Sequence, residues 1–339
     1  MGSSSRRSLV LVLALSPLLA SASERPVGFK RIDVPRAGEA PIQVGLWYPS
    51  AGAPVKQSLG LWSHEVVVDG PVSGAKVPVV ILSHGASGSL ASHVDLAVAL
   101  ARAGFLAAAV THLGDNDRDQ SLAGSRANLV QRPEVIRLVV DHLFHTWAGR
   151  GHLLAGEAGI FGFSLGAFTA LVSIGGTPDL GEIPKLCATR ASAPECAFVA
   201  SHHGDQGGPE TGAPPRWAHV PSFTAAVLAA PALGFTFTKA GLEPVRVPIQ
   251  LWRAEKDADA PDEWNSRLIR ARLPHPPEEH VVPAARHLSF LPPCRPEVAS
   301  SVPAVCSDPP GFDRAAFHQV LVDQVVRFFR AHLGNQRSQ

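Results

Sequence analysis

The first candidate for a catalytic side chain is a serine that lies between two glycines, in the segment Gly162-Phe163-Ser164-Leu165-Gly166. In the pattern G-x-S-x-G, the glycines let a strand turn sharply into a helix, so that the serine hydroxyl stands exposed on a strained elbow. A glycine-rich turn with an incidental serine would give the same pentapeptide. The rest of the sequence must therefore supply the partners that such a serine needs.

A serine hydroxyl is a poor nucleophile at neutral pH, so it needs a base to take its proton and an acid to orient that base. The acid is expected after a late strand, where Asp257 follows "VPIQLW", with Asp259 and Glu255 as near alternatives. The base is expected between the last strand and the closing helix, where His287 stands. We therefore predict Ser164, Asp257 and His287 as the catalytic residues.

Two backbone N–H groups are expected to stabilise the oxyanion that forms when the serine attacks a carbonyl. One belongs to Leu165, the first residue after the serine. The other is placed in the loop "SHGASG", at Ala86 with Ser87 as the alternative, while His84 is expected to brace this loop by a hydrogen bond.

An apolar substrate pocket is predicted around the serine, and it would suit a short or medium acyl chain. The stretch "LAAPALGFTF" at 228–237 contributes to its walls. The side chains predicted to line it are Phe163, Leu288 and Phe290.

Alternating strands and helices must position these residues, and they predict a doubly wound, mostly parallel α/β sheet with antiparallel strands at its N-terminal side. Ligands of such sheets bind beyond the carboxyl ends of the strands. The predicted strands are 28–34, 42–48, 77–85, 105–110, 159–162, 225–230, 247–252 and 279–282. Residues 49–75 are predicted as a surface excursion, and 175–221 as a cap or long loop over the sheet.

Three predicted helices have apolar residues at helical spacing. The first follows the 77–85 strand and stops at Gly104. The second has Pro133 in its first turn. The third spans 314–333, with Phe317, Val320, Leu321, Val325, Phe328 and Phe329 expected to face the core.

The N-terminus predicts a signal peptide over residues 1–22, with Arg6 and Arg7, an apolar run at 9–19 and the small residues Ala20-Ser21-Ala22 as the cleavage site. The run is short and contains Pro17, which makes an uncleaved anchor the weaker interpretation. We expect an exported protein, periplasmic or secreted by the general or the twin-arginine route, with no stable membrane anchor after cleavage. Residues 23–339 are then one domain that includes the cap.

Four cysteines lie in two local pairs, and an exported protein meets an oxidising compartment. Disulfides Cys187–Cys196 and Cys294–Cys306 are predicted, with zinc binding the weaker alternative because the spacings fit no structural site. Neither a metal nor a cofactor is predicted. After signal cleavage, 28 basic residues stand against 29 acidic ones, which gives no electrostatic case for nucleic acid as a partner.

Four segments in this order resemble the α/β-hydrolase superfamily: "VVILSHGASGSLASHVDLAVALARAGFLAAAVTHLGD", "GFSLG", "VPIQLWRAEKD" and "RHLSFLPPC". Within it, they and the tail "VCSDPPGFDRAAFH" are similar to the exported predicted dienelactone hydrolases, related to platelet-activating-factor acetylhydrolase. This resemblance implies a role in lipid degradation. Dienelactone hydrolases proper use a cysteine at the elbow, whereas this chain has Ser164. The resemblance implies the same three catalytic residues and the amides of Ala86 and Leu165 as the oxyanion hole.

The sequence thus predicts a serine hydrolase that cleaves small carboxylic esters through an acyl-enzyme on Ser164. An amidase or peptidase would use the same groups, and a catalytically silent ligand-binding homologue would keep the fold. A metallohydrolase using His84, His93, His112 or the pair 202–203 is the weakest alternative, because these histidines lack a zinc motif's spacing. The sequence predicts neither the physiological substrate nor an oligomeric state.

Overall fold

A single twisted sheet organises the molecule, which the computed structural model describes for residues 25–202 and 215–334. Across these residues the strand order is β10-β9-β8-β7-β5-β6-β2-β1-β4-β3. The strands are β1 (Val27–Arg36), β2 (Glu39–Pro49), β3 (Val55–Leu59), β4 (Trp62–Val68), β5 (Val77–Ser83), β6 (Leu106–Val110), β7 (Leu153–Phe163), β8 (Phe223–Ala229), β9 (Ile249–Ala254) and β10 (Glu278–Val282).

The strand directions confirm the predicted fold class. All neighbouring pairs among β5 to β10 are parallel, whereas β1 pairs with β2, and β2 with β6, in antiparallel register. The helices are α1 (Val94–Arg102), α2 (Arg126–His145), α3 (Leu165–Ser173), α4 (Glu182–Thr189), α5 (Pro194–His202), α6 (Lys239–Leu242), α7 (Ser266–Arg272), α8 (Pro296–Ala299), α9 (Pro303–Cys306) and α10 (Arg314–His332), with 3-10 turns η1 (Arg150–His152), η2 (Gly234–Thr236) and η3 (His287–Phe290).

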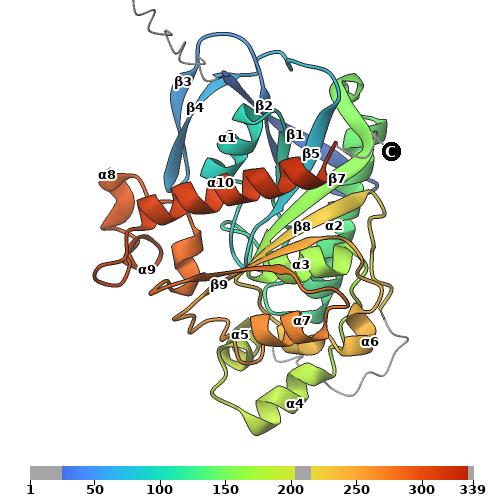
Figure 1. The fold of residues 1–339 in the computed structure, drawn as a ribbon, viewed down its shortest axis with the longest axis vertical. Coiled ribbons are helices and arrows are strands. Elements are labelled where there is room, and N and C mark those ends of the chain that lie inside the picture. The colour runs from blue at the N-terminus through green and yellow to red at the C-terminus, as the bar shows by residue number, and fades with distance from the viewer. Residues whose placement is uncertain (1–24, 203–214, 335–339) are drawn as a thin grey trace, which may run out of the picture.

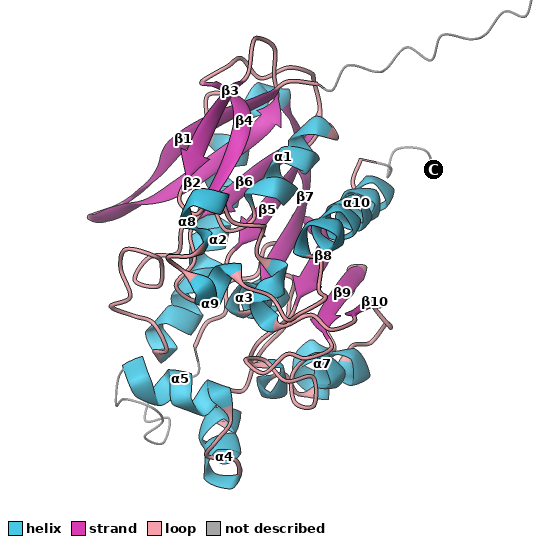
Figure 2. Cartoon of the chain, turned by 90° about the vertical axis from the view of Figure 1, so that its left-hand side faces the viewer, coloured by secondary structure: helices cyan, strands magenta, loops and turns pink. Residues whose placement is uncertain are grey.

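Two hydrophobic cores cover the two faces of the sheet. Along β5, Val79 and Ile81 belong to the core under α2 and α3, and Val80 and Leu82 to the core under α1 and α10. Successive side chains of a strand point to opposite faces, so a continuous apolar run such as that of β5 needs cover on both. Figures 1 and 2 show α10 and α1 on one side of the sheet and α2 and α3 on the other.

The prediction of a surface excursion at 49–75 is wrong in part, because β3 and β4 form an antiparallel hairpin there. Trp62, His64 and Val66 of β4 alternate inward and are buried, which is the period of a strand. The neighbouring glycines and serines concealed this alternation in the sequence. The hairpin extends the sheet beyond β1, to which β4 pairs.

Two helix predictions also need correction. α2 begins at Arg126 instead of near Pro133, because the Ser125 hydroxyl caps it by accepting from the Asn128 amide at 3.1 Å. Pro133 therefore lies inside the helix. In α10, Val320 is 54% exposed, since the core stripe runs through Phe317, Leu321 and Val325.

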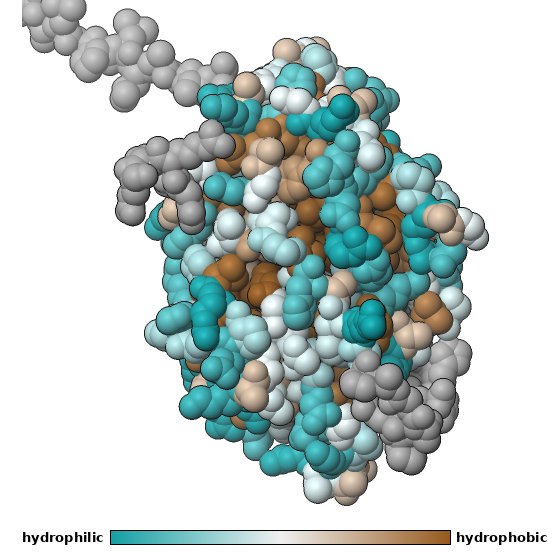
Figure 3. Space-filling view, turned by 90° about the vertical axis from the view of Figure 1, so that its right-hand side faces the viewer, coloured by the Kyte–Doolittle hydropathy of each residue, from teal (hydrophilic) through white to brown (hydrophobic). Residues whose placement is uncertain are grey.

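The predicted signal peptide at 1–22 lies outside the described residues. Within residues 25–202 and 215–334, no helix has the length and apolar character needed to cross a bilayer. On the face shown in Figure 3, hydrophobic residues gather in patches interspersed with hydrophilic ones.

The sulfur atoms pair as predicted, Cys187 with Cys196 and Cys294 with Cys306.

Candidate active site

Ser164 stands on a strained turn between β7 and α3. Its φ is 56° and its ψ is −119°, a conformation that L-residues with a side chain rarely adopt. The flanking glycines are required sterically, because a Cβ on Gly162 would lie 2.1 Å from the carbonyl oxygen of Gly166, and one on Gly166 would lie 2.0 Å from that of Ser83. The elbow predicted from the sequence is therefore present.

The register of the parallel strands brings the predicted site residues to one edge of the sheet. Phe163 pairs with Ala229, and Ala229 with Trp252, so β7, β8 and β9 end at nearly the same level. Val282 at the end of β10 pairs with Ala254 at the end of β9. The loops that follow β9 and β10, which contain Asp257 and His287, consequently begin beside the serine elbow.

Ser164, His287 and Asp257 form a continuous hydrogen-bonded chain. His287 Nε2 lies 2.8 Å from Ser164 Oγ, and His287 Nδ1 lies 2.8 Å from Asp257 Oδ2. A carboxylate can only accept, so Nδ1 carries the proton and Nε2 is free to accept from the serine hydroxyl. The other oxygen of Asp257 accepts from the amides of Ala260 at 2.7 Å and Asp259 at 3.1 Å, which fixes the carboxylate.

The two alternative acids have other positions. Glu255 accepts from the amide of Ala284 through Oε2 at 2.8 Å, away from the histidine. Asp259 is exposed and lines the cavity in front of Ser164. Among the described carboxylates, Asp257 is the one that contacts His287.

Asp115, which forms a buried ion pair with Arg132, supports the loop in which the second oxyanion donor was predicted. The amide of Ser87 donates to Asp115 Oδ1 at 2.8 Å, so the alternative donor is already engaged. Ala86 and Leu165 line the cavity together with Ser164. Their two amides are therefore the candidates for an oxyanion hole.

Arg132 connects the two sides of this candidate oxyanion hole. Its guanidinium donates to Asp115 Oδ2 at 2.7 Å, to the carbonyl oxygen of His84, and to Thr169 Oγ1 at 3.1 Å. Thr169 in turn donates to the carbonyl oxygen of Leu165 at 2.9 Å. Burial alone would raise the pKa of Asp115, but Arg132 and the hydrogen bonds to this carboxylate lower it. Sequence reasoning missed this pair, since neither residue stands in a motif.

His84 braces the loop as predicted. Its Nδ1 lies 2.6 Å from the carbonyl oxygen of Gly85, and its Nε2 accepts from the amide of His112 at 3.1 Å. Burial, reinforced by the charge of Arg132, lowers the pKa of His84 to about 3. A neutral imidazole with both nitrogens engaged supports the loop and has no free atom for a base.

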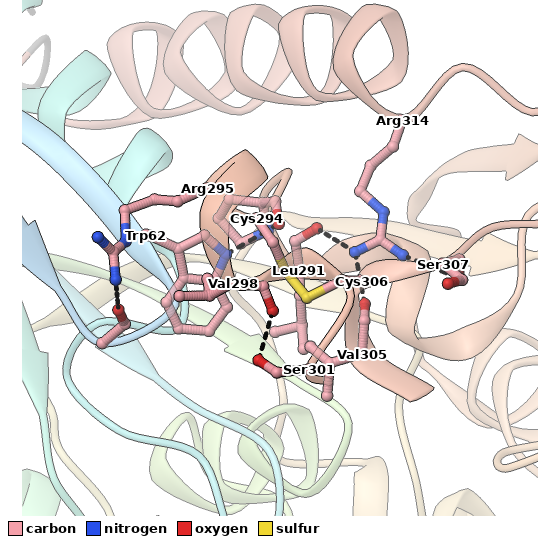
Figure 4. Close-up of a disulfide and its surroundings, with 12 residues drawn as sticks. Trp62, Leu291, Cys294, Arg295, Val298, Ser301, Val305, Cys306, Ser307 and Arg314 are labelled. Carbon is pink, nitrogen blue, oxygen red and sulfur yellow. Dashed lines mark hydrogen bonds between the residues drawn. A yellow bond between two sulfur atoms is a disulfide. The ribbon is translucent and has the colours of Figure 1, made fainter. Parts of the chain in front are cut away.

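The segment after His287 is fastened on several sides, as Figure 4 shows. The Cys294–Cys306 disulfide closes it, and Trp62 Nε1 donates to the carbonyl oxygen of Pro292 at 2.9 Å. From α10, Arg314 donates to the carbonyl oxygen of Val305 at 2.8 Å and to Asp308 at 2.7 Å. These contacts hold the backbone that presents the histidine.

A cavity of about 350 Å³ lies in front of Ser164, with mostly apolar walls. Phe163 and Leu288 line it as predicted. The prediction for Phe290 is wrong, because its fully buried ring lies in the core and packs edge-on against Phe317 at 5.2 Å. The residues around the cavity are Gly85, Ala86, Gly124, Leu129, Phe163, Ser164, Leu165, Pro194, Glu195, Phe198, Val199, Ala232, Leu233, Asp259, His287 and Leu288.

The predicted cap contributes one wall of this cavity through α5. α4 and α5 lie together at the lower end of the molecule in Figures 1 and 2, and the Cys187–Cys196 disulfide joins them. The sequence of this region shows no helical periodicity of apolar residues, because both helices are short. Residues 203–214, which include the second histidine of the pair at 202–203, lie outside the described residues.

Comparisons with known proteins support the fold through structures and not through sequence. No family model and no curated protein sequence matches the chain. A ferulic acid esterase from Streptomyces cinnamoneus is similar in structure, with a TM-score of 0.60 and 19% identity over 93% of this chain and 92% of that one. The chain has the α/β-hydrolase fold.

Two further solved structures are similar to this chain. Esterase 2 of Thermogutta terrifontis, in a form phosphorylated by paraoxon, has a TM-score of 0.54 and 13% identity over 90% of this chain and 94% of that one. A dienelactone hydrolase from Anabaena variabilis has a TM-score of 0.49 and 16% identity over 90% of this chain and 98% of that one. At identities under 25%, the two structures with TM-scores of 0.60 and 0.54 establish the fold alone.

Proposed function

We propose that the protein is a serine esterase in which Ser164 is the nucleophile, His287 the general base and acid, and Asp257 the residue that orients the histidine. The observation that carries this proposal is the chain of two 2.8 Å hydrogen bonds from Ser164 Oγ through His287 to Asp257. The strained elbow and the cavity in front of the hydroxyl support the same roles.

In the proposed reaction, Ser164 Oγ attacks the ester carbonyl carbon while its proton passes to His287 Nε2. The amides of Ala86 and Leu165 stabilise the negative oxygen that results. His287 then gives the proton to the departing alkoxide as the carbon–oxygen bond breaks, which leaves an acyl group on Ser164. A water molecule, deprotonated by His287, attacks this acyl-enzyme and releases the carboxylic acid.

We propose carboxylic esters with short or medium acyl chains as substrates, since the cavity is small and mostly apolar. Two of the similar structures are esterases, and one of these is a ferulic acid esterase, so aromatic esters belong in the first screen. We include lipid esters, which the resemblance to acetylhydrolases implies, among the proposed substrates. We place the chain in the exported branch of predicted dienelactone hydrolases.

We further propose that the protein is exported, with residues 1–22 as its signal peptide and 23–339 as one hydrolase domain with a cap. Two disulfides fit an oxidising environment. N-terminal sequencing of the exported protein tests the cleavage site. A mature chain that begins at Ser23 is expected, and one that begins at Met1 would contradict the proposal.

Matched p-nitrophenyl esters and p-nitroanilides, from acetyl to dodecanoyl, test the reaction class. We expect hydrolysis of the shorter esters, loss of this activity in Ser164→Ala, and full activity in a control with the exposed Ser192→Ala. Preference for the anilides would favour an amidase, and no turnover of either series would favour a silent ligand-binding protein.

A further inference from the structure

A second histidine contacts the turn that presents the proposed catalytic base. This turn, η3, begins with His287 and includes Ser289. The carbonyl oxygen of Ser289 lies 2.9 Å from Nε2 of His318, which belongs to α10. Only 5% of His318 is exposed, and no step of the proposed reaction uses it. A buried titratable group in this position requires a physical explanation.

Both ring nitrogens of His318 face acceptors. Nδ1 lies 2.6 Å from Oδ2 of Asp95, which is in the first turn of α1. The other oxygen of Asp95 accepts from the amide of Leu96 at 2.8 Å, so this carboxylate is fixed on its own helix. A carboxylate and a carbonyl can only accept, and a neutral imidazole has one N–H. Both contacts of His318 are therefore hydrogen bonds only when its ring is an imidazolium.

The groups on α1 favour the imidazolium form of His318. Burial alone would raise the pKa of Asp95, but the charge of His318 and the hydrogen bonds to this carboxylate lower it. Asp95 is therefore ionised at neutral pH and offers His318 an opposite charge. His93, which lies next to α1, is neutral, because burial lowers its pKa to about 3. It adds no positive charge that would oppose the imidazolium.

The charged groups on the other contacts of Ser289 offset each other. The Ser289 hydroxyl donates to Asp308 Oδ1 at 2.9 Å and accepts from the amide of Arg286 at 3.1 Å. Asp308 is paired with Arg314 of α10 at 2.7 Å. Because these two charges are opposite, they leave Asp95 as the partner that decides the charge of His318.

Loss of one ring proton from His318 would break its contact with η3. The negative charge of Asp95 retains the proton on Nδ1, so deprotonation leaves a lone pair on Nε2. That lone pair would face the carbonyl oxygen of Ser289, and the buried carbonyl would lose its donor. The turn would then be less firmly held two residues from His287, whose 2.8 Å hydrogen bond to Ser164 tolerates little displacement.

We propose that His318 is a positioning residue for His287, and that its imidazolium form holds η3 in the active geometry. The inference rests on the proposed esterase function and adds a pH-dependent support to it. His287 must be neutral to accept the proton of Ser164, so activity rises with pH as His287 loses a proton. Activity falls with pH as His318 loses one. The two histidines thus limit activity from opposite sides of the pH range.

The pH dependence of kcat tests the inference, with p-nitrophenyl butyrate as the substrate and a correction for spontaneous hydrolysis. Circular dichroism restricts the range to pH values at which the protein is folded. For the wild type we expect a bell-shaped profile. Asp95→Asn removes the opposite charge, so its descending limb should lie about half a pH unit or more below that of the wild type. His332→Gln, in the last turn of α10, is the matched control and should keep the wild-type profile.

Two amide side chains at position 318 separate the roles of the two ring nitrogens. His318→Gln can place an N–H donor near the position of Nε2, whereas the shorter His318→Asn can place one near Nδ1. Neither side chain titrates, so both variants should lack the descending limb. We expect His318→Gln to keep kcat within about threefold of the wild-type maximum. His318→Asn should lose about tenfold or more, because the buried carbonyl of Ser289 has no donor.

The protons on His318 can also be observed without any substrate. Nitrogen NMR spectra of protein with isotopically labelled histidine distinguish a protonated ring nitrogen from an unprotonated one, and the signals of His318 are those absent from His318→Gln. At the pH of maximal kcat we expect both nitrogens of His318 to carry a proton. As the pH rises along the descending limb, Nε2 should lose its proton.

Each outcome decides the inference. It would be overturned by a wild-type profile without a descending limb, by the same limb in His318→Gln, by equal kcat values for the glutamine and asparagine variants, or by an unprotonated Nε2 at the pH of maximal kcat. If the variants at 318 do not fold, the Asp95→Asn profile and the wild-type NMR spectrum, with His318 assigned through its contacts, decide. Failure of the wild type to hydrolyse any neutral ester would instead contradict the proposed esterase function on which the inference rests.

Discussion

The two disulfide-closed regions at the candidate active site are built differently. The segment after His287 is closed by the Cys294–Cys306 disulfide and is tied to two other parts of the chain, through Trp62 of β4 and Arg314 of α10. Within the part of the cap that the structure describes, neither α4 nor α5 is buried along its whole length, and no residue of α4 is buried. Its inward contacts come from Ile183 and Leu186 of α4, which are partly buried against the core, and from α5, where Glu195 accepts from Asn265 and Trp264.

This difference in anchoring corresponds to two requirements of the proposed reaction, proton transfer and selection of the acyl chain. Proton transfer between Ser164 and His287 depends on a hydrogen bond whose geometry tolerates little error. Selection of an acyl chain depends on a wall that can vary without disturbing the chemistry. We therefore expect changes near the sheet edge to lower the rate on every ester, and changes in the cap to alter which ester is preferred.

Asp257→Asn should have the largest effect. An amide at this position favours the wrong histidine tautomer, so we expect kcat to fall by about 10,000-fold with a thermal midpoint near that of the wild type. Asp323→Asn, on the exposed side of α10, is the control and should retain its kcat. Steady-state kinetics with a short ester measure both, and a fall of less than about tenfold in Asp257→Asn would contradict its orienting role.

Arg132→Met should lower both stability and rate. It leaves the Asp115 carboxylate buried without its ion pair, which costs about 3–5 kcal/mol of unfolding free energy. The loop of Ala86 loses its support, so kcat should fall by about 100-fold. Urea unfolding and kinetics measure the two effects.

Arg137→Met serves as the control for this variant, because it removes a partly exposed arginine from the same helix. Its ion pairs with Glu134 and Asp141 should contribute about 1 kcal/mol or less. An equal loss of unfolding free energy in the two variants would show that the buried pair has no special importance.

Removal of each disulfide compares the two regions directly. The half-cystines are 9 residues apart in the cap and 12 apart after His287, so the chain-entropy model gives each bridge about 3 kcal/mol of unfolding free energy. The effects on activity should differ. The Cys294→Ala/Cys306→Ala variant should lower kcat on all esters.

The Cys187→Ala/Cys196→Ala variant should instead change the ratio of kcat/KM between long and short acyl chains, with little loss on the acetyl ester. Kinetics over the acyl ladder measure this ratio. Equal losses of kcat in the two double variants would remove the distinction between the anchored segment and the cap.

The pH dependence of stability gives the smallest predicted effect. Burial lowers the pKa of His93 to about 3, from 6.5 in an unfolded chain. Between these two values the unfolded state binds a proton that the folded state does not, so the unfolding free energy falls as the pH drops below 6.5. One such histidine contributes about 1.4 kcal/mol per unit of pH.

His93→Phe should therefore reduce the loss of stability between pH 6.5 and 5.5 by about 1 kcal/mol, because the unfolded histidine is only half protonated at pH 6.5. Its ring can keep the contacts with Phe161 and Phe163. His275→Gln, at an exposed position, should leave that loss unchanged. Urea titrations at the two pH values provide the comparison, and parallel pH curves for His93→Phe and the wild type would contradict the account.

Much of the site could be predicted because its residues stand at fixed places relative to strands. The apolar runs predict where the strands end, and the residues just beyond those ends are Ser164, Asp257 and His287. Both disulfides could be predicted as well, since each pair is local in the sequence.

The remaining features depend on contacts between distant residues. Arg132 and Asp115 stand in no motif, and only the packing of α2 against α3 brings the arginine to both sides of the candidate oxyanion hole. Phe290 follows His287 closely, yet the η3 turn directs its ring into the core. Glu195 lies in a cap without a readable period, so its approach to the cavity required the structure.

The most direct test of the central claim is to locate the covalent adduct formed by a fluorophosphonate probe on the mature protein. Phosphonylation requires a serine activated by a neighbouring base, so peptide mass spectrometry should find one adduct, on Ser164, and none in His287→Ala. An adduct on another residue, or none under conditions in which the protein hydrolyses esters, would contradict the assignment of Ser164, His287 and Asp257.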